Sequence, residues 1–330
     1  ISNVTIQNTI GDGIVTGYDG VRIENSTIKN NGGDGILIMA KTEVYNNSIK
    51  SNSDIGISVT SGGSYSEISS NIIDDNDEQG ILVANAHHVI IKSNTVEENE
   101  DYGIQLYYAN YTQLSSNTVE ENDGGLRTIG SNGCNITSST FKDNNGKGIW
   151  FTTNSDSNNI RDSSASGSSS NDIELDSSNK NTGFNFTFGS GSIDVDSDSD
   201  FRIMNSLNIK FVNGSSAFAG VELELFNYDT VLYASPFYGG NDGASGSDGF
   251  IDSEFTVAYE IYNGSSTTED VQTFLKYSYG VRGKQIEIDM STSHTETVDV
   301  PSFWTKGLVR NTDTSTDYYK IQDAIDNASA

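Results

Sequence analysis

The chain has 330 residues, of which 34% are hydrophobic, and its formal net charge is −28. The length predicts two or three domains, and a low hydrophobic content with abundant Ser, Asn, Gly, Thr and Asp is typical of a solenoid with a thin core and many turns. Because phosphate contacts require basic patches, the acidic balance argues against a nucleic-acid partner and suits an extracellular protein or one that binds divalent cations.

A repeat of a glycine followed by an aliphatic residue runs through residues 1–176. The steps between successive aliphatic members are 22, 21, 24, 23, 22 and 23 residues, and a fixed period of this size indicates a repeat architecture. Short hydrophobic runs in each repeat alternate with period two, which is the pattern of strands. We therefore expect about eight coils of a right-handed parallel β-helix. The pairs are Gly13-Ile14, Gly35-Ile36, Gly56-Ile57, Gly80-Ile81, Gly103-Ile104, Gly125-Leu126 and Gly148-Ile149.

Two columns of asparagine recur with the same period. Asparagine adopts left-handed backbone conformations readily and forms local hydrogen bonds, so we interpret both columns as stacked turn residues rather than as a binding strip. One column follows an inward-facing apolar position by three residues and comprises Asn31, Asn52, Asn76, Asn99, Asn122 and Asn144. The other precedes that position by two residues and comprises Asn47, Asn71, Asn94 and Asn117.

Carboxylates stack in the central coils and form a first candidate metal site. Like charges on adjacent coils, about 4.8 Å apart, repel one another, and Ca²⁺, which takes about six to eight oxygen ligands, would neutralise them. The alternative is an acidic face exposed to salty water. The candidate ligands are Asp75, Glu98, Glu121 and Asp143.

Aromatic side chains gather in neighbouring coils of the second half of the repeat. Outward rings can stack on sugars, so the candidate ligand-binding residues are Tyr107, Tyr108, Tyr111 and Trp150. The alternative is that these rings cover turns and subunit contacts. Arg127 is the best candidate for the basic residue that a polysaccharide lyase or epimerase requires, but no recognisable motif surrounds it. We therefore expect no enzyme activity and assign no catalytic residue.

Residues 177–200 are predicted to form an acidic junction after the repeat. The junction ends in a run with an acid at every second position, made up of Asp194, Asp196, Asp198 and Asp200. Carboxylates at a domain boundary are a second candidate Ca²⁺ site, although the Gly and terminal Glu of an EF-hand loop are missing. A flexible acidic linker is the alternative, and Ca²⁺ is the only cofactor that the sequence suggests.

The second half of the chain has a different periodicity. Residues 201–301 contain longer alternating strands separated by turns rich in Gly, Asn and Ser, and several antiparallel strands at such spacing predict a small β-sandwich. Residues 302–330 are predicted to form a linker and a short amphipathic segment. Its apolar helical face would carry Tyr318, Ile321 and Ile325.

Nine Asn-x-Ser/Thr motifs occur in the chain. In a secreted protein the exposed ones are acceptors for glycosylation, and the candidates are Asn3, Asn110, Asn185, Asn213 and Asn263. The single cysteine, Cys134, excludes an internal disulfide. No apolar run is long enough to predict a transmembrane span.

The coils resemble the parallel β-helix repeats of NosD-like and pectate-lyase-like proteins, as found in long surface proteins of archaea and some bacteria. Residues 219–223, 247–249 and 301–304 resemble parts of a carboxypeptidase-regulatory-like, Ig-like module. The tail, from 307–311 through 319–329, is similar to the start of a further β-helix domain, where it supplies a first strand and a capping helix. The resemblance implies an all-β chain: a right-handed β-helix, an Ig-like antiparallel sandwich and a short C-terminal capping helix.

We expect a structural protein of the extracellular surface, such as a subunit of a filament, sheath or S-layer-like assembly. The C-terminal segment of one copy would cap the β-helix of the next, and such a head-to-tail contact makes an open polymer unless it closes into a ring. The expected partners are therefore copies of the chain itself, and in addition a cell-surface or environmental polysaccharide. A carbohydrate-binding adhesin and a polysaccharide lyase or epimerase are the alternatives.

Overall fold

The computed structural model describes residues 1–189, 192–227, 230–264, 268–280, 282–305, 309–311 and 316–318. It divides into two compact units, the first made of residues 1–203 and 261–269 and the second of residues 204–260 and 270–330. Apart from three short 3₁₀ turns, η1 (Ser61–Gly63), η2 (Pro236–Tyr238) and η3 (Ser302–Thr305), every element in the described residues is a strand. The described part of the chain is therefore all-β, as predicted.

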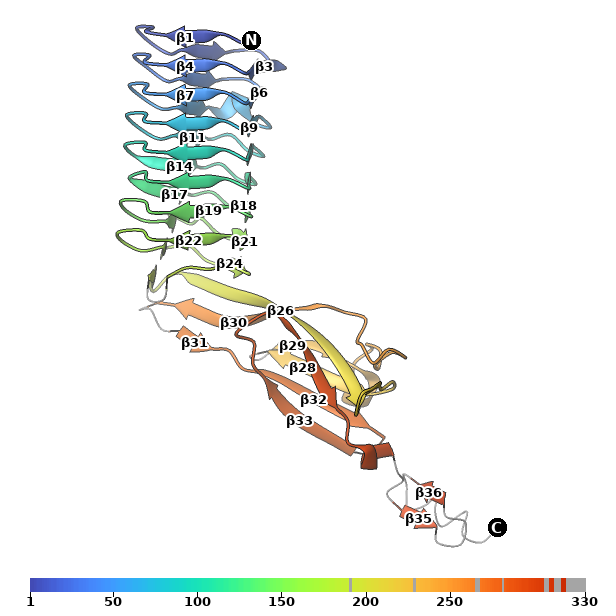
Figure 1. Cartoon of the computed structure of the whole chain (residues 1–330). Helices are drawn as coiled ribbons and strands as arrows, with labels where there is room; N and C mark the ends of the chain where they lie inside the picture. The colour runs from blue at the N-terminus through green and yellow to red at the C-terminus, as the bar shows by residue number, and fades with distance from the viewer. Residues whose placement is uncertain are drawn as a thin grey trace. The chain divides into compact units, whose positions relative to one another are not determined.

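The first unit is a parallel β-solenoid of about nine turns, which confirms the predicted β-helix. Each turn gives one strand to each of three sheets, and equivalent strands of successive turns pair in parallel (Figure 1). The eight-stranded sheet contains β1 (Thr5–Gln7), β4 (Thr27–Lys29), β7 (Ser48–Lys50), β10 (Ile72–Asp74), β13 (Thr95–Glu97), β16 (Thr118–Glu120), β19 (Thr140–Lys142) and β22 (Ser164–Ser166).

In the nine-stranded sheet, the strands of the first seven turns start next to the repeated glycines. It contains β2 (Ile14–Thr16), β5 (Ile36–Ile38), β8 (Ile57–Val59), β11 (Ile81–Ala84), β14 (Tyr102–Tyr107), β17 (Gly124–Ile129), β20 (Ile149–Thr152), β23 (Ile173–Asp176) and β25 (Ile193–Val195). The third sheet of the solenoid follows the order β3 (Val21–Glu24), β6 (Thr42–Tyr45), β9 (Glu67–Ser69), β12 (Ile90–Lys92), β15 (Gln113–Ser115), β18 (Asn135–Thr137), β21 (Asn159–Arg161) and β24 (Asn181–Phe184).

Aliphatic ladders form the core of the solenoid. The side chains of Ile28, Ile49 and Ile73 are completely buried and in register on successive turns. The repeated glycines are required because each turn passes very close to the next: a Cβ at Gly35 would lie 2.6 Å from the carbonyl oxygen of Gly56. The same steric constraint recurs once per turn, and this is why glycine recurs in the sequence with the period of the repeat.

Asparagine ladders form two corners of the solenoid, as predicted. In the first, the Nδ2 of Asn31 donates to the Oδ1 of Asn52 at 2.9 Å, and the pattern continues to Asn144. The second runs through Asn47 and Asn71, which are joined by a 3.0 Å bond of the same kind. Left-handed backbone lies one residue earlier than expected, because residues such as Asp75 (φ 55°) turn the chain so that the following asparagine can point inward.

The solenoid continues beyond residue 176. The strand β24 lies within the segment predicted as an acidic junction, and β25 pairs in parallel with β23, placing Asp194 opposite Glu174. Aromatic side chains lie at this end of the first unit, where Phe186 contacts Phe188 and Phe201 with ring centroids 5.5 and 6.3 Å apart. The segment 177–200 is therefore part of the last turns rather than a linker.

The second unit has one hydrophobic core, and two sets of strands contribute side chains to it. An antiparallel sheet has the order β29 (Thr230–Ala234), β28 (Glu222–Asn227), β32 (Thr273–Tyr279) and β33 (Arg282–Ile288). The long strand β26 (Asp200–Asn213) begins in the first unit and pairs with β27 (Ser216–Ala217) and β34 (His294–Asp299), and β30 (Phe255–Asn263) and β31 (Thr268–Asp270) complete the sheet order. Both sets contribute to the core, in which Ile209 of β26 is buried together with Leu223 and Leu275 of the antiparallel sheet.

One strand pair of the second unit differs from the sequence prediction. The strands β26 and β34 are parallel, with Leu207 opposite His294, whereas antiparallel strands were expected throughout. Parallel neighbours require a long connection between them, and the residues between 213 and 294, which include the four-stranded sheet, supply it. The strands were predicted from the alternation of apolar and polar residues. This alternation is the same in parallel and antiparallel strands, so it carries no information about strand direction.

Little of the C-terminal prediction falls within the described residues. The strands β35 (Val309–Asn311) and β36 (Thr316–Tyr318) form an antiparallel pair, in which Val309 lies opposite Tyr318. Tyr318 is thus at the end of a strand. The predicted assembly residues Ile321 and Ile325, and with them the capping helix, lie outside the described residues.

Candidate functional site

An arginine beside two aromatic rings that contact each other is the centre of a candidate site on the outer surface of the nine-stranded sheet. Parallel pairing of β14, β17 and β20 aligns Gln105, Arg127 and Trp150 in one outward column. The guanidinium carbon of Arg127 lies 4.3 Å from the ring centroid of Trp150 and 5.6 Å from that of Tyr102. The two ring centroids are only 6.3 Å apart, so the rings contact each other and do not sandwich the guanidinium. Both distances are within the range of cation–π attraction, which helps to hold the guanidinium in place.

Arg127 has no carboxylate partner within the described part of the chain. Its Nε is buried and lacks a hydrogen-bond partner there, and none of the ion pairs found includes its guanidinium. Arginine keeps its charge and presents several donors in a fixed plane, which suits bidentate binding of a carboxylate. The side chain is therefore a fixed cation whose remaining donors are available to a ligand.

The Trp150 ring, predicted as a sugar-stacking platform, already has several partners. The Nζ of Lys147 lies 3.3 Å from its centroid, and the indole Nε1 donates to Asp176 at 2.7 Å. Lys147 in turn forms a 2.6 Å ion pair with Glu174. These contacts fix the ring and leave little of its faces free, so Trp150 positions cations at this surface rather than offering an open face.

Tyr102 forms the other wall of the arginine site. Burial raises its pKa to about 12, and the nearby Asp101 acts in the same direction while Arg127 opposes it. The ring covers Gly124 on the next turn, where a Cβ would lie 2.3 Å from the Tyr102 Cε1. A phenol with this pKa stays protonated near neutral pH, so it can donate a hydrogen bond but is a poor general base.

The remaining predicted ligand-binding tyrosines do not converge on this site as a group. Tyr107 and Tyr108 are adjacent exposed rings in an edge-to-face pair with centroids 4.7 Å apart. Tyr111 lies on another corner and stacks on His88 at 5.1 Å, and His88 stacks on Tyr65 at 5.0 Å. Because stacked rings cover each other's faces, this second set is a ladder along the corner.

The acidic columns lie at the surface of the solenoid. The predicted ligands Asp75, Glu98, Glu121 and Asp143 are exposed and occupy left-handed turn positions. Beside them, burial and the carboxylates of Asp74 and Glu120 raise the pKa of Glu97. Lys142 forms an ion pair with Glu120, which relieves the repulsion at one end of the column.

The acidic run at the end of the solenoid is used in backbone hydrogen bonding. The Asp196 carboxylate accepts the N–H groups of Ser177 and Asp198, and Asp200 accepts that of Lys180. Asp194 and Asp198 are exposed. Within the ranges that the structure covers, no group of three or more His, Cys, Asp or Glu side chains is arranged to hold a metal ion. Ca²⁺ binding by either acidic set stays a prediction.

The predicted glycosylation residues lie in different surroundings. Asn3, Asn185 and Asn263 are exposed, whereas Asn110 and Asn213 are half-buried. The Nδ2 atom, to which a glycan would be attached, donates to Asp162 in Asn185 and to the Val300 carbonyl in Asn213. Exposure therefore favours Asn3 and Asn263 over Asn213.

Sequence reasoning missed the groups that surround Arg127 and Trp150. Lys147, Glu174 and Asp176 were not singled out, although Glu174 and Asp176 lie opposite Trp150 and Thr152 on the adjacent strand. The separation of 24 residues between Trp150 and Glu174 is one repeat. Applying the period to the polar residues, and not only to the apolar ones, would have placed them side by side.

Comparisons with known proteins agree with this architecture. Residues 1–133 match the family model described as a right handed beta helix region, and no curated protein matches the chain. The A-module of the mannuronan C-5 epimerase AlgE4 from Azotobacter vinelandii is 15% identical, with a TM-score of 0.54 over 59% of this chain and 60% of that chain. The enzymatically active domain of tailspike protein 2 from bacteriophage CBA120 is 10% identical, with a TM-score of 0.51 over 88% of this chain and 66% of that one.

These similarities concern the fold. The chain spans about 60% of the length of the epimerase module, and at such low identity the solved structures show a shared architecture alone. No helix among the described residues is both long enough and apolar enough to cross a membrane. The matched region and the parallel sheets together show that residues 1–133 form a right-handed parallel β-helix.

Proposed function

We propose that the protein binds a uronate-containing polysaccharide outside the cell, through the nine-stranded sheet around Arg127. The observation that carries the proposal is the stacked guanidinium, which has no ion-pair partner in the described residues of a chain with a net charge of −28. A uronate carboxylate would accept the remaining guanidinium hydrogens, and the Tyr102 hydroxyl would supply a further donor. The names of the structural neighbours, a mannuronan epimerase and a phage tailspike, support a polysaccharide as ligand.

Replacing Arg127 tests this proposal. The substitution Arg127→Ala removes the cation, and loss of a charge-assisted bidentate contact is expected to weaken binding of alginate or polygalacturonate about tenfold or more. Binding is measured by calorimetry near physiological ionic strength, where the Debye length of about 8 Å screens the rest of the acidic surface. Arg161→Ala is the matched control, because Arg161 stacks on Phe184 at 3.9 Å on a different sheet.

Unchanged affinity of the Arg127→Ala variant would contradict the proposal. The same samples also report on catalysis, because proton NMR detects an inverted uronate and ultraviolet absorbance detects an unsaturated one. Either product, formed by the natural chain and lost in the variant, would show that the protein is an epimerase or lyase rather than a binding protein.

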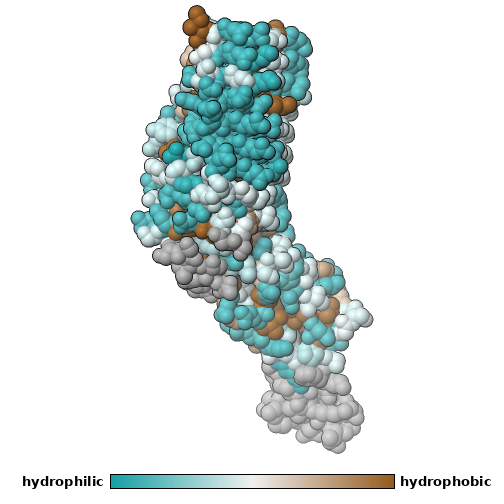
Figure 2. Space-filling view, turned by 60° about the vertical axis from the view of Figure 1, so that its left-hand side comes forward, coloured by the Kyte–Doolittle hydropathy of each residue, from teal (hydrophilic) through white to brown (hydrophobic). Residues whose placement is uncertain are grey.

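We propose further that copies of the chain associate head-to-tail, with the C-terminal segment of one copy covering the β-helix of the next. The observation in favour is the apolar surface on the first turn, where Ile10 is completely exposed and Val15 and Val4 are 51% and 40% exposed. Figure 2 shows a protruding hydrophobic group at this end of the largely hydrophilic solenoid surface. A second copy would bury them, and no Ca²⁺ is required for that contact.

Deleting residues 318–330 should abolish this association. Negative-stain electron microscopy and light scattering are used to compare the full and shortened chains, because removal of the segment that covers the neighbouring turn leaves single particles. Arg161→Ala, which changes neither end, should assemble like the natural chain. Polymers of the shortened chain would show that the C-terminal segment does not make the contact.

A further inference from the structure

A second surface of the solenoid contains a polar hollow of about 210 Å³, which belongs to the sheet formed by β3, β6, β9 and β12. It lies in the first turns, on a different sheet from Arg127. The residues that line it include Arg22, Tyr45, Glu67, Ser69 and Lys92. None of these residues was singled out from the sequence.

The hollow exists because a small residue lies between two large ones in one outward column. Parallel register places Tyr45 opposite Ser69, and Ser69 opposite Lys92. Adjacent strands are about 4.8 Å apart, so the backbones that carry Tyr45 and Lys92 are separated by about 9.6 Å. Ser69 is 3% exposed and lies at the floor of the hollow, below the larger side chains of Tyr45 and Lys92.

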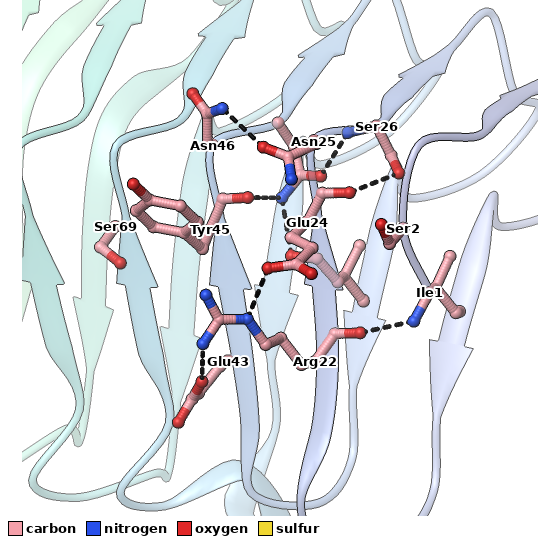
Figure 3. A network of polar contacts seen from close by, with 12 residues as sticks. Ile1, Ser2, Arg22, Glu24, Asn25, Ser26, Glu43, Tyr45, Asn46 and Ser69 are labelled. Carbon is pink, nitrogen blue, oxygen red and sulfur yellow. Dashed lines mark hydrogen bonds and ion pairs between the residues drawn. The ribbon is translucent and has the colours of Figure 1, made fainter.

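An aromatic ring forms one wall of the hollow. Tyr45 is 40% exposed, and the guanidinium carbon of Arg22 lies 5.3 Å from its ring centroid. Figure 3 shows the Tyr45 ring extending toward Ser69 on the next strand, with Arg22 and Glu43 below it. An exposed, partly immobilised tyrosine beside a hollow provides an apolar platform for the C–H groups of a sugar ring.

Charged side chains surround the platform, and each cation is already paired with at least one carboxylate. Arg22 forms ion pairs with Glu24 at 2.7 Å and with Glu43 at 2.9 Å. On the other side, Lys92 pairs with Glu67 at 2.9 Å, and Glu67 also accepts a hydrogen bond from Ser69 at 3.1 Å. With two cations and three carboxylates, the hollow offers no free positive charge to an anionic ligand.

These groups can nevertheless bind hydroxyls. The hydrogen bond from Lys92 lowers the pKa of Glu67, so that carboxylate stays ionised and accepts hydrogen bonds near neutral pH. Each carboxylate has more acceptor positions than its protein partners occupy, and the ammonium group of Lys92 has further hydrogens to donate. Sugar hydroxyls both donate and accept, so a pair of opposite charges beside an aromatic ring matches a hydroxyl-rich ring.

We propose that the hollow binds one neutral hexopyranose unit of a glycan, with the sugar ring against Tyr45 and its hydroxyls bonded to Glu67 and Lys92. This site is independent of the Arg127 surface, since it lies on another sheet and takes an uncharged ligand. The protein would thereby contact two kinds of saccharide at two places. If one of the two sites does not bind its saccharide, binding at the other site is unaffected.

The test is saturation-transfer difference NMR with a panel of methyl hexopyranosides (gluco, galacto and manno, both anomers). At least one is expected to bind with a dissociation constant on the order of 1 mM, and its affinity should be insensitive to salt because the ligand carries no charge. Methyl glucuronoside and glucosamine serve as charged comparisons. Binding of a charged ligand alone would overturn the proposal, as would absence of binding by every neutral glycoside.

Two substitutions localise the binding. Tyr45→Ala removes the platform and should weaken binding about tenfold, while Ser69→Phe fills the hollow and should abolish it. Thr137→Phe is the matched control, since Thr137 follows Ser115 in the same outward column, two turns beyond Lys92. Thermal unfolding confirms that each variant is folded. Unchanged affinity in folded Tyr45→Ala would place the sugar elsewhere and contradict the proposal.

Discussion

Gly56→Ala is expected to destabilise the solenoid by about 3 kcal/mol, because the added methyl group has no space. A Cβ at this position would lie 2.6 Å from both the Gly80 carbonyl oxygen and the Ile73 Cγ2 atom. Neither atom can move away cheaply, since one belongs to the backbone of the next turn and the other is completely buried. The measurement is the midpoint of thermal unfolding followed by circular dichroism.

Gly17→Ala provides the control for this experiment. No atom lies within 4 Å of a Cβ at Gly17, so the same chemical change should alter the free energy of unfolding by less than about 0.5 kcal/mol. If the two variants had the same midpoint of thermal unfolding, the repeated glycine would have a reason other than the close approach of successive turns.

Asn99→Leu is expected to cost about 4 kcal/mol, because it removes several buried hydrogen bonds at once. Asn99 is 2% exposed. Its Nδ2 donates to the Asn122 Oδ1 at 2.8 Å and to the Glu97 carbonyl at 2.9 Å, and its Oδ1 accepts from the Asn76 Nδ2 at 2.8 Å. Leucine has a similar size but leaves these partners unsatisfied in the interior. Chemical denaturation measures the loss.

The matched control for this ladder variant is Asn135→Ala. Asn135 is exposed and accepts a single side-chain hydrogen bond of 3.3 Å from Asn159. Water replaces that contact, so a change below about 0.5 kcal/mol is expected. Equal losses in the two variants would mean that the buried ladder contributes no more to stability than one exposed hydrogen bond.

The sequence predicted those features of the solenoid that depend on a single turn. Glycine, inward aliphatic residues and ladder asparagines must recur once per turn, and the buried Ile73 and Asn76 were placed correctly on that ground. The extent of the solenoid was underestimated because the last turns carry degraded repeats: β25 packs only Val195 completely inside, between exposed or half-buried neighbours. The polar composition of these turns is what a linker would also have.

The candidate sites were harder to predict because they depend on contacts between turns. The repeats vary from 21 to 24 residues, so the register of outward side chains is not evident from the local pattern. Tyr45, Ser69 and Lys92 become neighbours only when the pairings of β6, β9 and β12 are known. Likewise, the cations above and below Trp150 come from its own turn and from the preceding one.

The asparagine ladder also has a direction. In every step the backbone N–H and the Nδ2 of one turn donate to the Oδ1 of the following turn, as from Asn31 to Asn52 and from Asn52 to Asn76. The backbone N–H and one Nδ2 hydrogen of each ladder asparagine therefore find their acceptor on a residue that the ribosome adds one repeat later. During synthesis each new turn completes its predecessor, so the nascent solenoid grows with a single unfinished layer at its moving end.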